Sequence, residues 1–375
     1  MTNRRSRRLV TGALLLGAAV TAGTAFGAPA HAATTGGIAT AYKLTLIKAG
    51  PIAGAETDVF GINASGEIFG TGDLAGQTAG FVKAAGASAA AFLGLPGNAA
   101  SSPEPFPEML NDNGDVVGSF ITSDADSDTH AIEWPGGTKP TDLTPLVSKA
   151  VGFDASGDDT VANGINDHGL IVAQTTAGSF ADGITIQGST VTRLPGLPGG
   201  GGAAGSTNTK PIAVNSSNLI VGSAVDKAGN EVAAEWRNGK VTALGGLPGS
   251  FQTAALAVNS SGLAVGASIS ATDFNEHAVE FVNGKVIDLG VPGETINDAQ
   301  AKAVNDSGVI VGRDGNGDAF AFASGKTVNL NTLIPANSGV TLTTANGISS
   351  SGVIVGDATI SGSGQIVGFE LTPVS

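Results

Sequence analysis

Residues 61–70 read GINASGEIFG, and this short pattern decides the fold because it recurs seven times along the chain. The copies occupy residues 61–70, 110–118, 164–172, 213–222, 257–266, 303–312 and 347–356. Their turn positions are 48, 55, 49, 44, 46 and 44 residues apart. A period in the forties is typical of propeller blades and similar arrays. We therefore number the repeats 1 to 7 in chain order.

Each copy predicts a tight turn between two strands, here called a and b. The Gly of the first copy, Gly66, stands where such turns need a left-handed backbone. Asn218 takes this place in repeat 4, and Asn is the next most tolerant residue in that conformation. The Asn earlier in each copy, such as Asn63, is expected to bond the backbone of its own turn, and Ser349 replaces it in repeat 7. We interpret these Asn residues as structural.

A second hairpin follows about twelve residues later in each repeat and predicts strands c and d. Asn238-Gly239 and Asn283-Gly284 separate alternating apolar runs, which is the strongest short hairpin signal. A Pro-Gly loop often ends strand d, as at residues 247–249. With 57 Gly and only 13% charged residues, the composition indicates strands and turns and not helices.

The two ends of the chain predict closure of a ring. Repeat 7 ends after strand c, at residues 365–371, and lacks strand d. Residues 42–47 resemble a strand d without a preceding a, b or c. Their pairing would hide two sheet edges. The predicted fold is all-β: a seven-bladed β-propeller of four-stranded antiparallel blades, closed by the N-terminal strand on the C-terminal blade.

The N-terminus predicts export from the cell. Four Arg residues precede an apolar run, and Ala30-His31-Ala32 is a small-x-small cleavage pattern, so residues 1–32 are read as a signal peptide. Residues 33–375 are then a single extracellular domain, which we expect to be a monomer without a membrane span. Cleavage leaves 14 basic against 32 acidic residues, a net charge of −18, which disfavours nucleic-acid partners.

The repeated motif, followed by a Leu-Pro-Gly loop, resembles the HAF family of extracellular repeats. His130-Ala131-Ile132 and His277-Ala278-Val279 are similar to the His-Ala-Phe element that names the family. The resemblance covers nearly all of the chain after residue 32. It implies a secreted repeat architecture and assigns no activity.

The connections between strands differ in their variability. The a–b and c–d turns are short and uniform, and they share one face of a meander, here called the turn face. The b–c and d–a connections vary from repeat to repeat and share the opposite, variable-loop face. Because variable loops on a rigid scaffold usually carry recognition, we expect binding on the variable-loop face.

Two b–c loops place oxygen ligands at alternate positions, which suits Ca²⁺. The alternative reading of both loops is a solvated hairpin tip, since Asp, Asn and Gly are ordinary turn residues. The candidate ligands are Asp124, Asp126 and Asp128 in repeat 2, and Asp314, Asn316 and Asp318 in repeat 6.

Catalytic motifs are not evident. The chain has no Cys, and His130, His168 and His277 lie in separate repeats. Trp134 and Trp236 share one strand c position and are expected in the core. We predict a binding or scaffold module for an extracellular protein or a glycan, and lean against an enzyme. Two alternatives stay open: a Ca²⁺-dependent adhesion module, and a propeller hydrolase or lyase acting on polysaccharide.

Overall fold

The structure is a computed structural model. It describes residues 37–50, 56–100, 105–123, 128–137, 139–151, 159–177, 180–200, 206–272, 274–292 and 299–374. The predicted signal peptide, residues 1–32, lies outside the described residues.

Repeats 1 to 6 each form a four-stranded antiparallel unit with strands a to d in chain order, and β1 completes the unit of repeat 7. Repeats 1 to 3 contain β2 (Asp58–Ile62), β3 (Ile68–Leu74), β4 (Gln77–Lys83), β5 (Ala91–Phe92); β6 (Phe106–Leu110), β7 (Val116–Ile121), β8 (Thr129–Trp134), β9 (Thr141–Asp142); and β10 (Asp159–Ile165), β11 (Leu170–Ala177), β12 (Phe180–Gln187), β13 (Thr190–Arg193). Repeats 4 and 5 contain β14 (Thr209–Val214), β15 (Ile220–Val225), β16 (Glu231–Arg237), β17 (Lys240–Gly245); and β18 (Ser250–Val258), β19 (Ala264–Ser270), β20 (Glu276–Val282), β21 (Lys285–Asp288). Repeats 6 and 7 contain β22 (Gln300–Val304), β23 (Ile310–Arg313), β24 (Ala319–Ala323), β25 (Lys326–Asn329); and β26 (Val340–Ile348), β27 (Ile354–Ile360), β28 (Ile366–Pro373), with β1 (Tyr42–Ile47).

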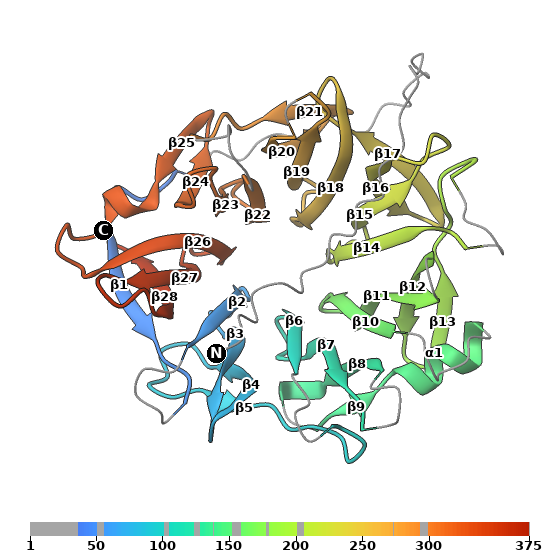
Figure 1. Cartoon of the computed structure of the whole chain (residues 1–375), viewed down its shortest axis with the longest axis horizontal. Helices are drawn as coiled ribbons and strands as arrows, with labels where there is room; N and C mark the ends of the chain where they lie inside the picture. Colours follow the sequence, from blue (N-terminus) through green and yellow to red (C-terminus); the bar gives the residue numbers. More distant parts are fainter. Residues whose placement is uncertain are drawn as a thin grey trace.

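Figure 1 shows these units side by side around a common axis, with strand a of each repeat innermost and strand d outermost. A single parallel bridge between Glu231 and Gln252 joins the units of repeats 4 and 5 into one eight-stranded sheet. The fold is therefore all-β and propeller-like, built from four-stranded antiparallel units as predicted. Within the described residues, no helix has the length and apolar character needed to cross a membrane.

The predicted pairing of the two chain ends is confirmed. β1 runs antiparallel to β28, with Leu44 opposite Leu371 and Tyr42 opposite Pro373. β1 thus occupies the strand d place of repeat 7 (Figure 1). The two edges that would otherwise face solvent satisfy each other.

The predicted turn chemistry is also confirmed. Asn218 has φ +60° and Gly66 has φ +83°, so both occupy the left-handed region. The Asn63 side chain accepts a hydrogen bond from the Glu67 N–H at 2.8 Å, inside its own turn. At the c–d turns, Asn238 and Gly239 both have positive φ, as a tight hairpin with an Asn-Gly tip requires.

The same Asn residues also link neighbouring repeats, which the sequence did not reveal. The Asn63 Nδ2 donates to the main-chain carbonyl of Asn111, the equivalent residue of repeat 2, at 3.0 Å. Equivalent bonds of 2.9 to 3.2 Å lead on through Asn111, Asn166, Asn215, Asn259 and Asn305 to the Ser349 carbonyl. All six Asn side chains and Ser349 are buried. Ser349 has no amide group, so this series stops between repeats 7 and 1.

A different cluster joins repeats 7 and 1. The Asn346 Nδ2 donates to the Val59 carbonyl at 2.7 Å and to Asp357 Oδ2 at 2.8 Å, and the Val59 N–H donates to Asp357 Oδ1 at 2.9 Å. Burial, with a smaller contribution from the negative charge of Asp58, raises the pKa of Asp357 to about 6. The carboxylate is therefore a structural bridge held at an electrostatic cost.

The hydrophobic core lies between neighbouring units. Phe120 and Trp134 of repeat 2 pack with Phe69 and Leu93 of repeat 1. The Trp134 Nε1 donates to the Gly94 carbonyl at 2.6 Å, and Trp236 makes the equivalent bond to Pro195 at 2.8 Å. Both Trp residues are buried, as predicted. The Trp hydrogen bonds thereby join the d–a connections after repeats 1 and 3 to the repeat that follows each.

Helical segments occur in the connections, although the composition predicted none. α1 (Thr144–Val151) follows β9 and buries Val147, and η3 (Leu330–Leu333) is a single 3₁₀ turn. The segment η1 (Pro135–Gly137) is a tight c–d turn in which Gly136 and Gly137 have positive φ. The Asp142 Oδ1 accepts a hydrogen bond from the Thr144 N–H at 3.0 Å and so caps the start of α1. The Asp142 cap and the burial of Val147 stabilise α1 locally, although the overall composition of the chain favours strands and turns.

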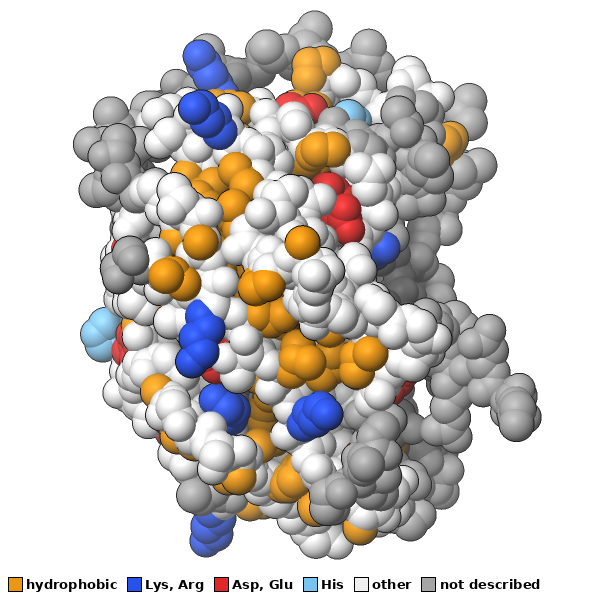
Figure 2. Space-filling model, turned by 90° about the vertical axis from the view of Figure 1, so that its left-hand side faces the viewer, with side chains coloured by type: hydrophobic (Ala, Val, Ile, Leu, Met, Phe, Trp, Pro, Cys, Tyr) orange, Lys and Arg blue, Asp and Glu red, His pale blue; other side chains and the backbone are white. Residues whose placement is uncertain are grey.

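The outer side that carries β1 and β25 is not strongly acidic, although the chain has a net charge of −14 (Figure 2). Lys and Arg side chains are scattered over it among neutral and hydrophobic ones. Leu46 of β1 is 37% exposed and contributes to the hydrophobic surface of the molecule.

Candidate functional site

Two cavities lie on the variable-loop face. The first, of about 230 Å³, is lined in repeat 5 by the end of β19, the start of β20 and the end of β21, together with the d–a connection from repeat 4. The second, of about 290 Å³, is lined by Asp318 at the start of β24 and by the connection from η3 to β26. Both are formed by b–c and d–a connections, where the sequence predicts recognition.

The repeats differ at one equivalent place beside these cavities, where the start of strand c meets the end of strand d. We call the two residues the entry pair. In every repeat, the strand d member lies opposite the residue two positions after the strand c member. The pairs in repeats 1 to 7 are Ala79/Phe92, His130/Asp142, Asp182/Arg193, Val232/Ala243, His277/Asp288, Asp318/Asn329 and Val367/Leu46.

Four of the seven entry pairs are polar, and in each of these the two members match. His130 Nδ1 lies 2.8 Å from Asp142 Oδ2, and His277 Nδ1 lies 3.1 Å from Asp288 Oδ2. In repeat 6, the Asn329 Nδ2 donates to Asp318 Oδ2 at 2.8 Å. The remaining three pairs are apolar on both sides. The two members of the entry pair thus share polar or apolar character in every repeat.

The strand d member also fixes the loop that follows it. Asp288 Oδ1 accepts the Gly290 N–H at 2.8 Å, and Asn329 Oδ1 accepts the Asn331 N–H at 2.9 Å. Asp142 caps α1 in the same way. In these three pairs, one terminal atom of the strand d side chain contacts the strand c member, and the other accepts a main-chain N–H of the d–a connection. These polar pairs shape the variable loops.

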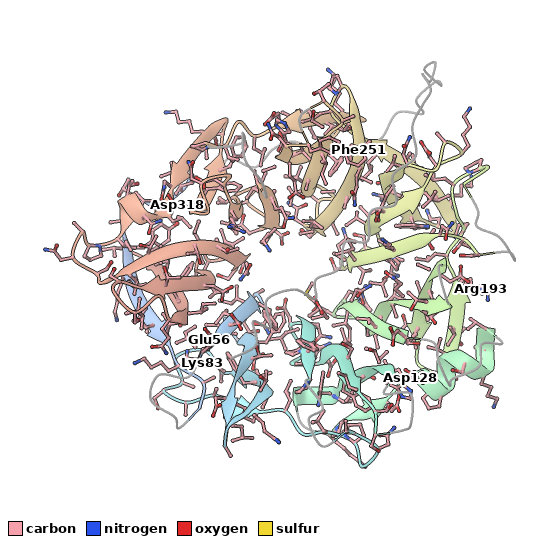
Figure 3. All side chains as sticks on the ribbon, viewed as in Figure 1. Glu56, Lys83, Asp128, Arg193, Phe251 and Asp318 are labelled. Carbon is pink, nitrogen blue, oxygen red and sulfur yellow. The ribbon has the colours of Figure 1, made fainter. Side chains whose placement is uncertain are left out.

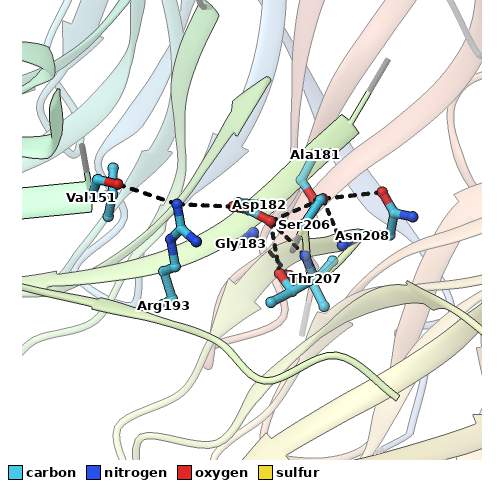
Figure 4. Close-up of polar contacts among 9 residues, drawn as sticks. Val151, Ala181, Asp182, Gly183, Arg193, Ser206, Thr207 and Asn208 are labelled. Atoms are coloured by element: carbon cyan, nitrogen blue, oxygen red, sulfur yellow. Dashed lines mark hydrogen bonds and ion pairs between the residues drawn. The ribbon is translucent and has the colours of Figure 1, made fainter. Parts of the chain in front are cut away.

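Repeat 3 anchors its loop through the strand c member instead (Figure 4). Asp182 Oδ1 accepts bonds from Ser206 Oγ at 3.0 Å, Thr207 N at 2.6 Å and Thr207 Oγ1 at 3.1 Å. The Arg193 Nη2 lies 3.5 Å from Asp182 Oδ2 and donates to the Val151 carbonyl at 3.3 Å. The Asp182 carboxylate thus holds the segment before β14.

Figure 3 places Asp128, Arg193, Phe251 and Asp318 at four different positions around the common axis, beside β8, on β13, on β18 and beside β24. The polar entry pairs are correspondingly distributed over repeats 2, 3, 5 and 6. They do not converge on one centre. Any ligand bound at one of them is contacted mainly by one repeat and the connection beside it.

The predicted Ca²⁺ ligands of repeat 6 do not all face one point. Asp314 Oδ1 accepts the N–H groups of Asn316 and Asp318 at 3.0 and 2.9 Å, which is the turn chemistry of the alternative reading. The Asp318 carboxylate instead bonds the amides of Asn329 and Asn331. Burial raises the pKa of Asp314, and the buried Asp314 Oδ2 has no hydrogen-bond partner among the described residues.

In repeat 2, Asp124 and Asp126 lie outside the described residues. Asp128 is buried, and its main-chain carbonyl accepts the Thr122 N–H at 3.0 Å. Among the described residues, no three His, Asp or Glu side chains are close enough together to hold a metal ion. The Ca²⁺ ligand sets of both loops stay predictions.

Sequence reasoning missed the aromatic pair of repeat 5. Phe251 of β18 and Phe274 of the b–c loop meet edge to face, with ring centroids 5.8 Å apart. Phe274 is 62% exposed and has φ +59°. The sequence did contain one indication of this pair, because Phe274 is an aromatic residue in an otherwise polar loop.

The sequence matches no protein-family model and no curated protein. Among solved structures, the chain is similar to YCF48 bound to D1 peptide, at 8% identity and a TM-score of 0.44, over 89% of this chain and 95% of that one. It is similar to puromycin hydrolase at 16% identity and a TM-score of 0.46, over 88% of this chain and 56% of the hydrolase. It is also similar to the Trypanosoma rangeli sialidase in complex with sialic acid, at 11% identity and a TM-score of 0.42, over 90% and 55% of the two chains. The chain thus spans little more than half the length of the hydrolase and of the sialidase. Its function therefore has to be inferred from its own residues and not from these neighbours.

Proposed function

We propose that this protein is a secreted, closed seven-bladed propeller of HAF-type repeats that binds an extracellular partner through its variable-loop face. The observation that carries the proposal is the entry pair. Seven equivalent positions keep one backbone register but carry different matched residues, and His277 and Asp288 line the first cavity, whereas Asp318 lines the second. Variation at fixed geometry on one face is what a recognition surface needs.

The loops of this face are held in place before a partner arrives. Asp182, Asp288 and Asn329 each use side-chain oxygens to bond main-chain N–H groups in the neighbouring connection. Such preorganisation lowers the entropy lost on binding. The carboxylates at these positions are occupied by loop anchoring, which supports binding in preference to hydrolysis.

The test compares the two faces with matched bulky substitutions. Ser270→Arg and Ala336→Arg fill the two cavities of the variable-loop face, whereas Ser216→Arg and Ser350→Arg alter exposed positions of the turn face. The four purified variants are tested against immobilised extracellular polysaccharides and peptides. We expect at least one ligand to bind the native chain and both turn-face variants, and at least one cavity variant to lose it. Loss confined to the turn-face variants would reject the proposal.

A Ca²⁺-dependent adhesion module is the second candidate, favoured by the unpartnered Asp314 Oδ2. The Arg313 guanidinium opposes it, because its positive charge already lowers the cost of an ionised Asp314. Calorimetry in EDTA and in Ca²⁺ decides between them. A rise in Tm with Ca²⁺ that disappears in Asp314→Asn supports a metal site, and an unchanged Tm rejects it.

A further inference from the structure

The loop between β19 and β20 exposes an aromatic ring in an unfavourable backbone conformation. Phe274 has φ +59°, a region that bulky side chains rarely adopt, and 62% of its surface is accessible. Such outliers persist where the surrounding structure fixes them, and they cluster at ligand-binding sites. Nothing in the core requires Phe at this place, because the ring is largely outside it.

Hydrogen bonds hold this loop on three sides. The Phe274 N–H donates to the Ser270 carbonyl at 3.1 Å, and the Ser270 N–H donates to the Asn275 carbonyl at 2.9 Å. The Ala271 N–H donates to the Gly249 carbonyl, on the d–a connection, at 3.0 Å. Phe251 supports the Phe274 ring from one side, with the two ring planes 73° apart. The exposed part of the ring is therefore presented in a fixed orientation.

The 230 Å³ cavity adjoins this loop and is lined by groups of complementary character. Ser250 and Ser270 supply hydroxyls, which both donate and accept hydrogen bonds, and the Ser270 hydroxyl also meets the Thr272 hydroxyl at 2.8 Å. The Ser268 hydroxyl is buried and accepts the Leu247 N–H at 3.1 Å. His277 is held by Asp288, so its ring is oriented. Leu247 and Pro248 supply the apolar part of the lining.

We propose that Phe274 and this cavity bind one ring of a neutral saccharide. The apolar face of a sugar ring would lie against Phe274, and its hydroxyls, which also donate and accept, would bond the Ser hydroxyls and His277. The cavity is smaller than the roughly 300 to 1,000 Å³ of drug-sized ligand sites, so it suits a single sugar unit.

The charges of the site favour a neutral ligand over an ionic one. Each oxygen of the Asp288 carboxylate already accepts or shares one hydrogen bond, with His277 and with the Gly290 N–H, and this opposes its recruitment by a cation. The negative net charge of the chain, −14, disfavours an anion. A peptide bound by strand addition would need a free sheet edge, whereas this site offers mostly side-chain hydroxyls.

The experiment uses the whole secreted chain and neutral probes: glucose, galactose, mannose and N-acetylglucosamine, with a tetrasaccharide of each. Saturation-transfer NMR and titration calorimetry measure binding. We expect at least one probe to bind. Phe274→Gly, which removes the ring and suits a positive φ, should weaken that binding at least tenfold without lowering Tm. Phe274→Trp should restore it, and Ser270→Ala should weaken it several-fold.

Leu74→Ala is the matched control, because Leu74 is 43% exposed at a b–c turn of the same face in repeat 1. It should leave saccharide binding unchanged. No binding of any probe, or binding that survives Phe274→Gly, would overturn the inference. Because it rests on the proposed function, the two failures must be separable. A non-saccharide ligand that binds and is lost in Ser270→Arg would refute the sugar alone, whereas a ligand lost only in Ser216→Arg would refute both.

Discussion

The turn face and the variable-loop face are built by the same seven repeats, yet they use polar side chains in opposite ways. On the turn face, buried Asn63 and its equivalents repeat one bonding pattern from unit to unit. On the variable-loop face, the entry pair changes from His/Asp to Asp/Arg to apolar while its register stays the same. The comparison shows that one side-chain type makes the same bond at six of the seven junctions on the turn face, whereas the entry pair differs in chemical character between repeats.

The largest expected effect is on the turn face. Asn166→Ala removes the bonds to the Asn215 carbonyl and Asn218 Oδ1, and it takes the Asn166 Oδ1 acceptor from the N–H groups of His168 and Leu170. We expect the free energy of unfolding to fall by about 3 kcal/mol. Chemical denaturation measures it, with the exposed Ser216→Ala as control, expected to stay within about 0.5 kcal/mol. If Asn166→Ala lowers the free energy of unfolding no more than the control does, the Asn residues of the turn face do not stabilise the fold.

The next effect concerns the boundary between repeats 7 and 1, where the Asn series is interrupted. Burial raises the pKa of Asp357 from 3.8 to about 6, so the folded chain binds this proton more tightly than the unfolded chain. The resulting stabilisation is complete below about pH 3.8 and is lost as the pH rises through 6.

Between pH 5 and pH 8, this group alone lowers the free energy of unfolding by about 1–2 kcal/mol. The Asp357→Asn variant should lack this part of the pH dependence. Denaturation of both chains at the two pH values gives the difference. Parallel stability curves would mean that Asp357 titrates near its ordinary pKa.

A smaller gain is expected from completing the Asn series. Ser349→Asn places an amide where the six other repeats have one, and by analogy with those repeats this amide is expected to bond the Asn63 carbonyl. One additional buried hydrogen bond should raise the free energy of unfolding by about 1 kcal/mol. Thermal unfolding is the measurement, and Ser350→Asn, on the exposed neighbouring position, is the control. Equal changes of the free energy of unfolding in both variants would show that the missing Asn at position 349 does not affect stability.

The smallest effect is expected on the variable-loop face. His277 and Asp288 are both partly exposed, and pairs of this kind contribute little in water. A double-mutant cycle of His277→Gln and Asp288→Asn should give a coupling of about 0.5 kcal/mol or less. A coupling as large as the Asn166 effect would make the entry pair a stability element and would break the contrast between the faces.

The sequence predicted the strands, the left-handed turns and the pairing of β1 with β28, because each depends on local spacing or on a missing partner. It did not predict the second bond of Asn63, because turn chemistry accounts only for the side-chain oxygen. The partner of that amide lies in the next repeat, at a distance that only packing sets.

The entry pairs escaped prediction for a similar reason. His277 and Asp288 stand on different strands, and they meet only because β20 and β21 adopt one particular register. His130 and His277 belong to the element that resembles the HAF family, whereas their partners Asp142 and Asp288 belong to no motif in the sequence. The Ca²⁺ hypothesis rested on alternate spacing, and Asp314 and Asp318 turn their carboxylates to different partners.

The place of β1 has a consequence for the order of events during biosynthesis. A ribosome makes a chain from its N-terminus, so β1 emerges before the other described strands, and β28, which pairs with it, emerges after them. Until then, β1 presents an open hydrogen-bonding edge that other chains can capture. Joining two segments so far apart is intrinsically slow. The pairing of β1 with β28 is thus expected to be the step that completes the fold. A delay in this pairing would favour exchange of β1 between newly made molecules.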